Sequence, residues 1–499
     1  MMGVITANKK LLLPLALVAA LTTAAYANSF SASFHLDDYH QIASNTNMYS
    51  LSNIPRFFVD ATSGTNIAGL RGYRPVTTVS FALSYALSGQ EVFGYHVVNF
   101  LLHLINSLLM FIVVRRVMEE ANSEGAATIA VFASALFCLH PIQTGAVTYI
   151  SGRAVLLATF FVLLSFYCFM AARAGGPRRT PLYAMSAVLF LLGLLSKEMA
   201  ISLVFIVAAY GVFFPHADRG PGRARRLIPY LLLLAVVVVF LIIKRIVQGY
   251  TVLPGVDYDV SRYLMTEARV LLVYLRLLLF PFNQNADYAM ATESYFSAFT
   301  AVGLAVAAGI AALAILFRKR KKAAAFFMAW FLLTLAPEST LVPILDAAVE
   351  YRLYLPSVGF FAVLATIIYR MVNGAARAPQ RAIVVASLML LAVLTFNRNM
   401  VWRNELSLWS DVSAKSPRSC RAQMNLGRAL VVGGRYSDAV PHLLKAVEMD
   451  PEFYSRVRIH SNLGICYMNL GRKDDAEREM TTAKELFEQQ KGRNVEQTP

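Results

Sequence analysis

The chain has 499 residues, of which 57% are hydrophobic and only 15% are charged, and its mean hydropathy is +0.52. Soluble domains carry roughly a quarter charged residues, so this composition excludes an ordinary soluble protein and predicts an integral membrane protein. The net charge of +16 does not indicate nucleic-acid binding, because the basic residues form short clusters between apolar stretches instead of one compact basic domain. Such clusters are typical of the positive-inside rule, and they lie at Lys9-Lys10, Arg115-Arg116, 173–179, 219–226, 318–322 and 370–381.

The first apolar segment, Leu11 to Tyr26, follows two lysines and ends in Ala25-Tyr26-Ala27, which is similar to a signal-peptide cleavage site. Cleavage there would detach the polar stretch that follows from its membrane anchor. We therefore interpret the segment as a retained first span, with a removed signal peptide as the alternative.

An acidic pair, Asp37-Asp38, stands in the polar stretch 34–40 directly after this span. Carboxylates at the mouth of a span are unfavourable and often functional. Glycosyl transfer to a hydroxyl requires a carboxylate that accepts the proton of the acceptor. We predict that one member of the pair is a general base, and the sequence does not choose between them. The alternative is a helix N-cap or a solvated turn.

The rest of 28–94 is rich in serine, asparagine and aromatic residues, and we predict a long outer loop. Within it, 76–87 could form an amphipathic helix at the membrane interface.

Ten further apolar stretches of about 15–20 residues follow, so we predict an all-α polytopic membrane protein with eleven transmembrane helices. The stretches lie near 95–114, 126–140, 153–171, 182–196, 200–214, 227–243, 298–317, 323–336, 355–371 and 382–396. This arrangement places every basic cluster and the N-terminus on the cytoplasmic side, and the C-terminal tail on the outer side.

The stretch 266–280 is apolar but carries Glu267, Arg269 and Arg276. A span there would move the basic cluster 318–322 to the outer face, against the charge rule. We therefore predict an interfacial or re-entrant segment.

Several cations are expected on the same face as the acidic pair, where they could bind the phosphate of a sugar donor. The candidates are Arg74, Arg153, Lys197 and Arg352, with His96, Glu198, Glu350 and Tyr354 as supporting residues. A single arginine at a span mouth is more often a snorkelling anchor. His96, Asn99 and His103 share one helical face, and for them we expect hydrogen-bonded packing and no metal site.

The tail beyond residue 396 is polar and contains an internal repeat, in which Asn425-Leu426-Gly427 recurs as Asn462-Leu463-Gly464. The further matches are Gly434 with Gly471, Ala439 with Ala476, and Ala446 with Ala483. Small residues at these places indicate two tetratricopeptide units, although the offset of 37 exceeds the usual value of about 34 residues. We expect the extra residues, near 453–458, to lengthen a turn.

We thus predict a transmembrane domain over 1–396, a connector over 397–419 and two repeats over 420–490. The repeats are expected to bind a protein acceptor, with Asn425 and Asn462 as candidate contacts. The alternative is a structural cap over the outer loops.

These features resemble the C-type integral-membrane glycosyltransferases, and specifically the transmembrane and tetratricopeptide repeat-containing O-mannosyltransferases. The stretches that carry the resemblance are Asp37-Asp38, Arg74-Pro75, 94–96 with Asn99 and His103, His140-Pro141, 151–153, 196–198, 352–357 and the repeats. The resemblance implies a polyprenyl-phosphate sugar donor, inversion at the anomeric carbon and an aspartate of the pair as base. A divalent metal is used by some of the superfamily and is not predicted here.

The short loops and brief tail are typical of a bacterial member, which implies the inner membrane, undecaprenyl phosphate as carrier and periplasmic repeats. We therefore predict transfer of a sugar to a protein hydroxyl on the outer face of the bilayer. Two alternatives remain: a membrane scaffold that recruits envelope proteins through its repeats, and a transporter of lipid-linked sugars.

Overall fold

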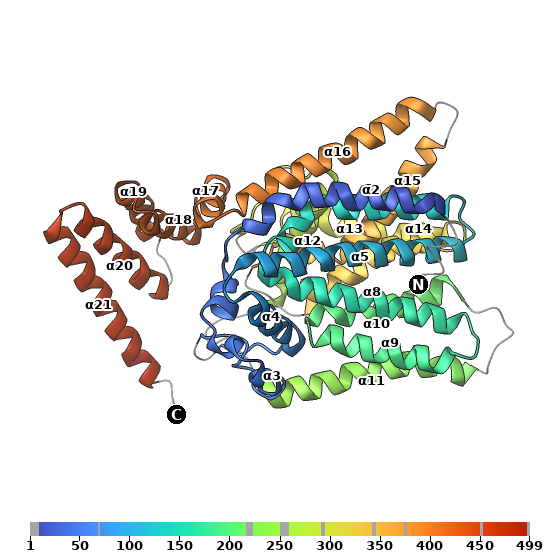
Figure 1. Ribbon diagram of the computed structural model, residues 1–499, viewed down its shortest axis with the longest axis horizontal. Coiled ribbons are helices and arrows are strands. Elements are labelled where there is room, and N and C mark those ends of the chain that lie inside the picture. Colours follow the sequence, from blue (N-terminus) through green and yellow to red (C-terminus); the bar gives the residue numbers. More distant parts are fainter. Residues whose placement is uncertain are drawn as a thin grey trace. The chain divides into compact units, whose positions relative to one another are not determined.

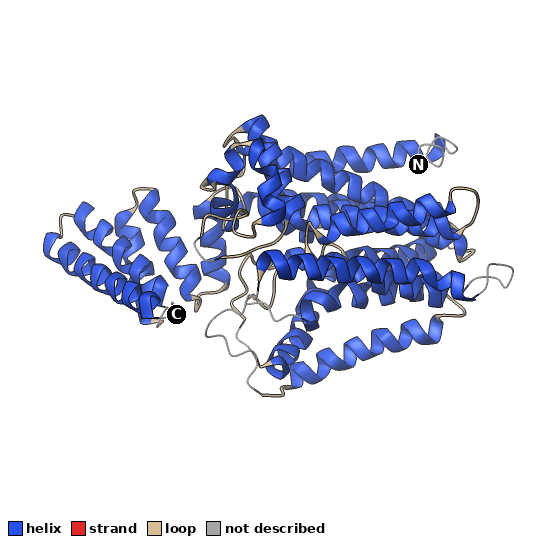
Figure 2. Cartoon of the chain, turned by 90° about the horizontal axis from the view of Figure 1, so that it is seen from below, coloured by secondary structure: helices blue, strands red, loops and turns tan. Residues whose placement is uncertain are grey.

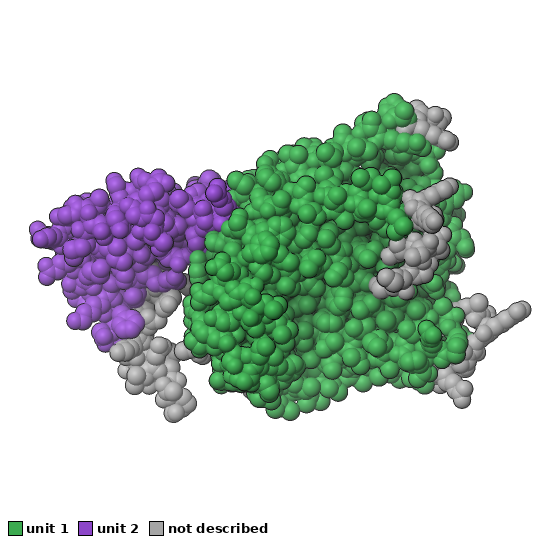
Figure 3. Space-filling view, in the orientation of Figure 1, with its two compact units in different colours: residues 1–284, 292–400 green, residues 285–291, 401–499 purple. Residues whose placement is uncertain are grey.

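A computed structural model describes residues 9–67, 70–215, 223–249, 259–290, 295–341, 346–373, 377–449 and 453–496. Within these ranges every regular element is a helix, as Figure 2 shows, so the predicted all-α class is confirmed. The chain divides into two compact units (Figure 3). The first comprises Met1–Gln284 and Thr292–Met400, and the second comprises Asn285–Ala291 and Val401–Pro499.

The first unit begins with α2 (Lys9–Tyr26), which packs against α6 (Ala126–Leu139). The side-chain amide of Asn399 donates a hydrogen bond of 3.1 Å to the carbonyl oxygen of Ala25 at the end of α2. The predicted outer loop contains short helices, including α3 (Ile54–Val59) and α4 (Pro75–Ser88), which gather at one end of the helices of this unit (Figure 1). The helix expected over 76–87 is therefore present as α4.

A helix lies at each of the eleven predicted spans. After α2 and α6 these are α5 (Val92–Glu120), α8 (Arg153–Arg173), α9 (Arg179–Leu194), α10 (Ser202–Phe213), α11 (Arg223–Gln248), α13 (Ala298–Phe317), α14 (Lys322–Ala336), α15 (Pro356–Val372) and α16 (Arg377–Val401).

Among the residues that the structure describes, six helices are long and apolar enough to cross a membrane, or seven if the bent pair Ala126–Leu139 and Pro141–Val147 counts as one span. The predicted number of eleven is therefore not confirmed. The reason is length, because α9 has 16 residues and α10 has 12. At about 1.5 Å per residue such helices are shorter than the roughly 30 Å hydrocarbon core.

The stretch that we predicted to be interfacial or re-entrant forms α12 (Val260–Leu279), which packs against α13. One side of α12 buries Glu267 and Tyr274, while Leu264 and Leu279 on the other side are exposed. Of the three charged residues of the stretch, Glu267 thus faces the protein, whereas Arg276 is exposed, and the interfacial placement stays a prediction.

A row of polar side chains on α5 connects this helix to its neighbours. His96 Nε2 lies 2.8 Å from the carbonyl oxygen of Ala32, and the Asn99 amide donates to the carbonyl oxygens of Val147 and Ile150, both at 3.2 Å. His103 Nδ1 lies 2.7 Å from the Tyr354 hydroxyl. The expected hydrogen-bonded packing of this face is confirmed.

The described residues of the second unit form five helices that follow one another along the tail. They are α17 (Glu405–Lys415), α18 (Cys420–Val432), α19 (Tyr436–Glu448), α20 (Phe453–Asn469) and α21 (Lys473–Glu496). Helix α18 packs on α19, and α20 packs on α21, so each unit of the repeat is a helix pair. Arg421 Nε lies 2.6 Å from Asp287 Oδ2, which ties segment 285–291 to α18. The transmembrane domain predicted over 1–396 includes residues 285–291, whereas here they belong to the second compact unit.

The three extra residues of the second repeat do not lengthen a turn, contrary to our expectation. They lengthen the first helix of the repeat, since α20 has 17 residues and α18 has 13. Added residues at a helix end continue the backbone hydrogen-bond ladder, so a longer helix is favoured where no helix breaker intervenes. The tetratricopeptide assignment itself stays a prediction.

We expect Gly427→Leu to destabilise the second unit by about 1–3 kcal/mol, because a side chain there must displace its neighbours. A Cβ at this position would lie 2.6 Å from Leu443 Cδ2, on the helix that packs against α18. Hydrogen exchange of the full chain should show faster exchange across α18 and α19. Gly433→Ala, where a Cβ meets only ordinary contacts at 3.4 Å and beyond, is the control, and equal exchange in both variants would contradict the prediction.

Candidate active site

Asp38 is the buried member of the acidic pair, with no exposed surface. Its Oδ1 accepts hydrogen bonds from the backbone N–H of Ser151 at 2.7 Å and from the Ser151 hydroxyl at 2.5 Å. Its Oδ2 accepts one from the backbone N–H of His35 at 3.0 Å. Burial raises the pKa of Asp38 to about 6, although these hydrogen bonds oppose the shift. Asp38 therefore ties the loop to the start of α8 and offers no free oxygen to a substrate.

Asp37 is the accessible member, with 58% of its side chain exposed. Its Oδ1 lies 3.3 Å from His40 Nε2, and its backbone N–H donates to the Tyr149 hydroxyl at 3.2 Å. Burial of the group would raise its pKa, but the hydrogen bond and charge of His40, together with Tyr149 and the charge of Arg74, lower the pKa of Asp37 below its ordinary value. Asp37 is thus an ionised, reachable carboxylate at neutral pH.

Arg74 lies directly before α4 and forms an ion pair with Glu198, at 3.2 Å between Nη2 and Oε2. Glu198 also pairs with Lys244 of α11, at 2.8 Å between Oε1 and Nζ. Arg74 keeps 43% of its side chain exposed. The charge of Glu198, opposed by burial, raises the pKa of Arg74, so the arginine stays cationic beside Asp37.

Lys197 is the neighbour of Glu198 in sequence but has a different partner. Its Nζ lies 2.7 Å from Glu338 Oε1 and 4.7 Å from the centre of the Tyr351 ring. Only 8% of the Lys197 side chain is exposed, and burial lowers its pKa while Glu338 opposes the shift. The charges of Asp37, Arg74 and Glu338 all act on the Tyr351 hydroxyl, so these three groups lie near Tyr351.

Arg352 follows Tyr351 and lies deeper, with 1% of its side chain exposed. Its guanidinium donates to the carbonyl oxygens of Asp346 and Ala347, both at 2.6 Å, and lies 3.5 Å from Glu267 Oε1. Burial raises the pKa of Glu267 to about 7, against the charge of Arg352. Arg352 acts on Lys197 through its charge and is less accessible than Arg74.

The structure therefore brings together five of the predicted site residues in one cluster of interacting charges: Asp37, Arg74, Lys197, Glu198 and Arg352. It adds residues that the sequence analysis gave no role. Tyr149 and Ser151 hold the acidic pair, Tyr351 and Glu338 adjoin Lys197, and Lys244 adjoins Glu198. Tyr351 and Ser151 could have been chosen from the sequence, because they lie within two residues of the predicted arginines Arg352 and Arg153. Glu338 and Lys244 are distant in sequence and left no signal.

Arg153 is placed elsewhere, in the interior, with no exposed surface. Its guanidinium donates to Asn99 Oδ1 at 2.8 Å, to the Tyr95 carbonyl oxygen at 2.8 Å and to Ser84 Oγ at 2.7 Å, and it stacks over the Phe81 ring. These contacts join α4, α5 and α8, so Arg153 has a structural position and is not available to a phosphate.

The other supporting residues are also engaged in packing. His96 holds the carbonyl oxygen of Ala32, and Tyr354 bonds to His103 inside the bundle. Glu350 is buried, accepts a hydrogen bond from Gln284 at 3.0 Å and lies 3.6 Å from Arg398 Nη2. These three residues support the fold around the cluster.

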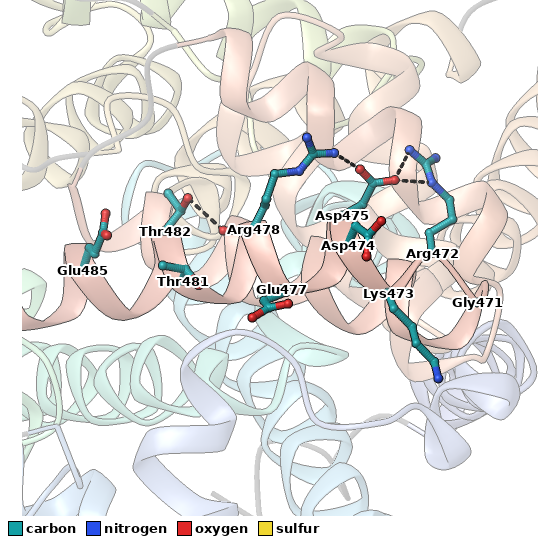
Figure 4. Close-up of a pocket in the computed structure, with 10 residues that line it drawn as sticks. All are labelled: Gly471, Arg472, Lys473, Asp474, Asp475, Glu477, Arg478, Thr481, Thr482 and Glu485. Atoms are coloured by element: carbon teal, nitrogen blue, oxygen red, sulfur yellow. Dashed lines mark hydrogen bonds and ion pairs between the residues drawn. The ribbon is translucent and has the colours of Figure 1, made fainter.

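The tail shows no comparable constellation at the predicted acceptor contacts. Asn425 is buried in α18, and the Asn462 amide donates to the Arg458 carbonyl oxygen of its own helix. Figure 4 shows a shallow hollow along α21, where Asp475 pairs with both Arg472 and Arg478. These opposite charges pair with one another at the beginning of α21. The acceptor contacts stay predictions.

Comparison with known proteins finds relatives that carry the name of the predicted family. Protein O-mannosyl-transferase Tmtc3 of Drosophila melanogaster is 27% identical over 93% of this chain and 58% of its own length. Human Protein O-mannosyl-transferase TMTC3 is 27% identical over 95% of the chain and 55% of its own, and the Caenorhabditis elegans Protein O-mannosyl-transferase F38B6.6 is 26% identical over 88% and 63%. The predicted family resemblance is confirmed.

This likeness to the O-mannosyl-transferases extends over most of the chain, whereas the chain spans only 55–63% of the length of these relatives. No family model matches the chain, and no solved structure gives a significant match.

We expect segment 35–38 to open more readily at pH 8 than at pH 5. The pKa of Asp38 is about 6 in the folded state and 3.8 in its ordinary state. A raised carboxyl pKa contributes stability that is complete below pH 4 and is lost as the pH rises through 6. Hydrogen exchange, corrected for the intrinsic rate, measures the opening, and Asp38→Asn should remove its pH dependence. Equal opening of the wild type at both pH values would contradict this prediction.

Proposed function

We propose that this chain is a glycosyltransferase that moves a sugar from a polyprenyl-phosphate donor to a hydroxyl group of a protein on the outer face of the membrane, with Asp37 as general base. The observation that carries the proposal is the exposed, ionised Asp37 close to the cation Arg74. Lys197 lies against the ring of Tyr351, on which the charge of Asp37 also acts. The relatives named as protein O-mannosyl-transferases support transfer to protein.

The two aspartates take different parts in this proposal. A general base must reach the proton that it removes and must be ionised at the working pH. Asp37 meets both conditions because it is exposed and its pKa is lowered. Asp38 does not meet the first condition, since it is buried and engaged with Ser151, and its raised pKa of about 6 leaves it protonated below that pH, so we assign it a positioning role.

In the proposed step the acceptor hydroxyl lies against Asp37, and its oxygen attacks the anomeric carbon of the donor from the face opposite the phosphate. Asp37 takes the hydroxyl proton as the new C–O bond forms. The bond between the anomeric carbon and the phosphate oxygen breaks, and the polyprenyl phosphate leaves with the electron pair. The configuration at the anomeric carbon is therefore inverted.

The departing phosphate gains negative charge, which nearby cations stabilise. We assign direct contact to Arg74, whose side chain is the more exposed, and to Lys197. Both are now paired with carboxylates, Glu198 and Glu338, so the phosphate would share or replace these partners. Arg352, which is buried, would stabilise the phosphate indirectly, through its interactions with Lys197 and Glu267. A divalent metal ion is not predicted for this step.

The remaining parts of the proposal concern location and acceptor. The short loops favour a bacterial inner membrane, with undecaprenyl phosphate as the carrier. The basic clusters favour an orientation with the repeats in the periplasm. The helix pairs α18–α19 and α20–α21 would present the protein acceptor, since helical repeats often bind peptides.

We expect Asp37→Asn to reduce the transfer rate by about 10²–10⁴-fold, because proton removal by a positioned base contributes that range. Intact-mass spectrometry of envelope proteins should show loss of a hexose-sized mass, and thermal unfolding should be unchanged because Asp37 is exposed. Asp38→Asn should instead reduce both activity and stability.

Asp60→Asn is the matched control, since Asp60 is another carboxylate of the same loop that pairs only with Arg56 and neighbouring Thr62 groups. Full transfer by a folded Asp37→Asn variant would contradict the assignment of the base. Unchanged masses in the variants and in a deletion strain would favour the scaffold or transporter alternatives.

We expect Arg74→Gln to raise the KM for the lipid-phosphate donor and to lower kcat/KM, while Arg74→Lys recovers part of the loss. The reason is that a guanidinium can bind a phosphate with two parallel hydrogen bonds, and an ammonium only as a point charge. Arg56→Gln, which removes an exposed arginine of the same loop, should leave both constants unchanged. An effect of equal size in Arg56→Gln would show that only the overall charge matters.

A further inference from the structure

A polar cavity lies at the opposite end of the first unit from Asp37. It has a volume of about 340 Å³ and lies between the turn that follows α5, the turn between α13 and α14, and the end of α15. Helix α5 begins at Val92, near the loop of the acidic pair, and ends at Glu120 beside this cavity. Its 29 residues correspond to about 43 Å at the usual rise per residue, so the cavity is remote from the proposed active site.

The side chains around this cavity carry a large excess of positive charge. Five cations line it, and they are Lys319, Arg320, Lys321, Lys322 and Arg370. Glu124 is the one acidic residue among the described residues of the lining. Converging cations in a concave site attract anions strongly, because their fields add in the cavity.

Backbone groups add to this potential. Helix α14 begins at Lys322, its N-cap residue Lys321 makes no side-chain cap, and its first turn has no acidic residue. Lys322, Ala323 and Ala324, the first residues of the helix, line the cavity. The unpaired N–H groups of a first helical turn and the helix dipole favour a bound anion, and phosphate is a frequent occupant.

The remaining walls are built from closely packed groups. The ring of Tyr369 packs directly over the backbone of Gly125, so that a Cβ at Gly125 would overlap the ring. Gly125 has a φ of +67°, a left-handed conformation that glycine adopts easily. The hydroxyl-bearing residues Ser123 and Thr366 also line the cavity, and the Thr366 hydroxyl donates to the carbonyl oxygen of Ala362.

The cavity lies at the level where two candidate spans end. The spans Val92–Glu120 and Ala298–Phe317 finish at residues that adjoin or line it. Only 17% of the apolar window of the second span is buried, so most of this helix is available to lipid. Lys321 Nζ lies 5.0 Å from the centre of the Phe317 ring, which holds one cation at that boundary.

We propose that this cavity binds the phosphate group of an anionic membrane lipid. Any ligand of this cavity would present a phosphate group to the converging cations and to the N-terminus of α14. The position of the cavity at the ends of two spans favours a lipid over a soluble phosphate. The proposal does not rest on glycosyl transfer, since the cavity and Asp37 lie at opposite ends of α5.

The test measures binding of phosphatidylglycerol to the full-length protein in detergent by native mass spectrometry, with phosphatidylcholine as the neutral lipid. Arg320→Gln/Lys322→Gln removes two cations of the cavity. Arg178→Gln/Arg179→Gln is the matched control, because it removes two cations at the start of α9 that do not line the cavity. Each lysine or arginine near an anionic lipid contributes about 1 kcal/mol, so the cavity variant should bind phosphatidylglycerol about thirtyfold more weakly.

Preferential binding of phosphatidylglycerol that is lost in the cavity variant and kept in the control supports the proposal. Competition by inorganic phosphate at millimolar concentration, with the same dependence on Arg320 and Lys322, would support the phosphate site but assign it to a soluble ligand. Equal weakening in both variants, or equal binding of the two lipids by the wild type, would overturn the proposal, because general surface charge would then explain the result.

Discussion

The burial of Asp38 is the constraint on which the proposed active site depends. A carboxylate with no exposed surface is unfavourable unless its oxygens accept hydrogen bonds, and here the Ser151 backbone and hydroxyl and the His35 backbone supply them. These bonds hold the loop after α2 against the beginning of α8, which are more than a hundred residues apart in sequence. Because Asp38 points inward, Asp37 is directed outward.

The charges around Asp37 are arranged in pairs, so that none of the cations of the cluster is isolated in a region of low polarity. Glu198 holds Arg74 and Lys244, Glu338 holds Lys197, and Glu267 adjoins Arg352. Isolated buried charges are strongly destabilising, and pairing removes much of that penalty. The same pairing keeps the cations in position near Asp37, which suits the binding of an anionic donor that competes with the carboxylates.

The two ends of the first unit therefore carry different electrostatic features. At one end cations and carboxylates alternate around an exposed base. At the other, five cations converge with the start of α14 and meet one acidic side chain. A balanced cluster suits a substrate that must arrive and leave, whereas an excess of one sign suits a ligand that stays bound, such as the headgroup of a structural lipid.

The sequence by itself determined the helical class, the positions of the apolar helices, the repeat in the tail and the family resemblance. Each of these is encoded locally, by composition, by the period of apolar residues or by small residues at a fixed spacing. It also proposed Asp37, Arg74, Lys197, Glu198 and Arg352 as candidates, because their charged side chains stand next to apolar stretches of the sequence.

Only the tertiary structure decided which aspartate is accessible, that Arg153 is enclosed by α4, α5 and α8, and that Glu338 and Lys244 complete the charge cluster. It also separated helices long enough to cross a membrane from shorter ones. These features depend on burial and on contacts between residues far apart in the chain. Neighbouring aspartates have the same chemistry in the sequence, and their environments differ only after the chain has folded around them.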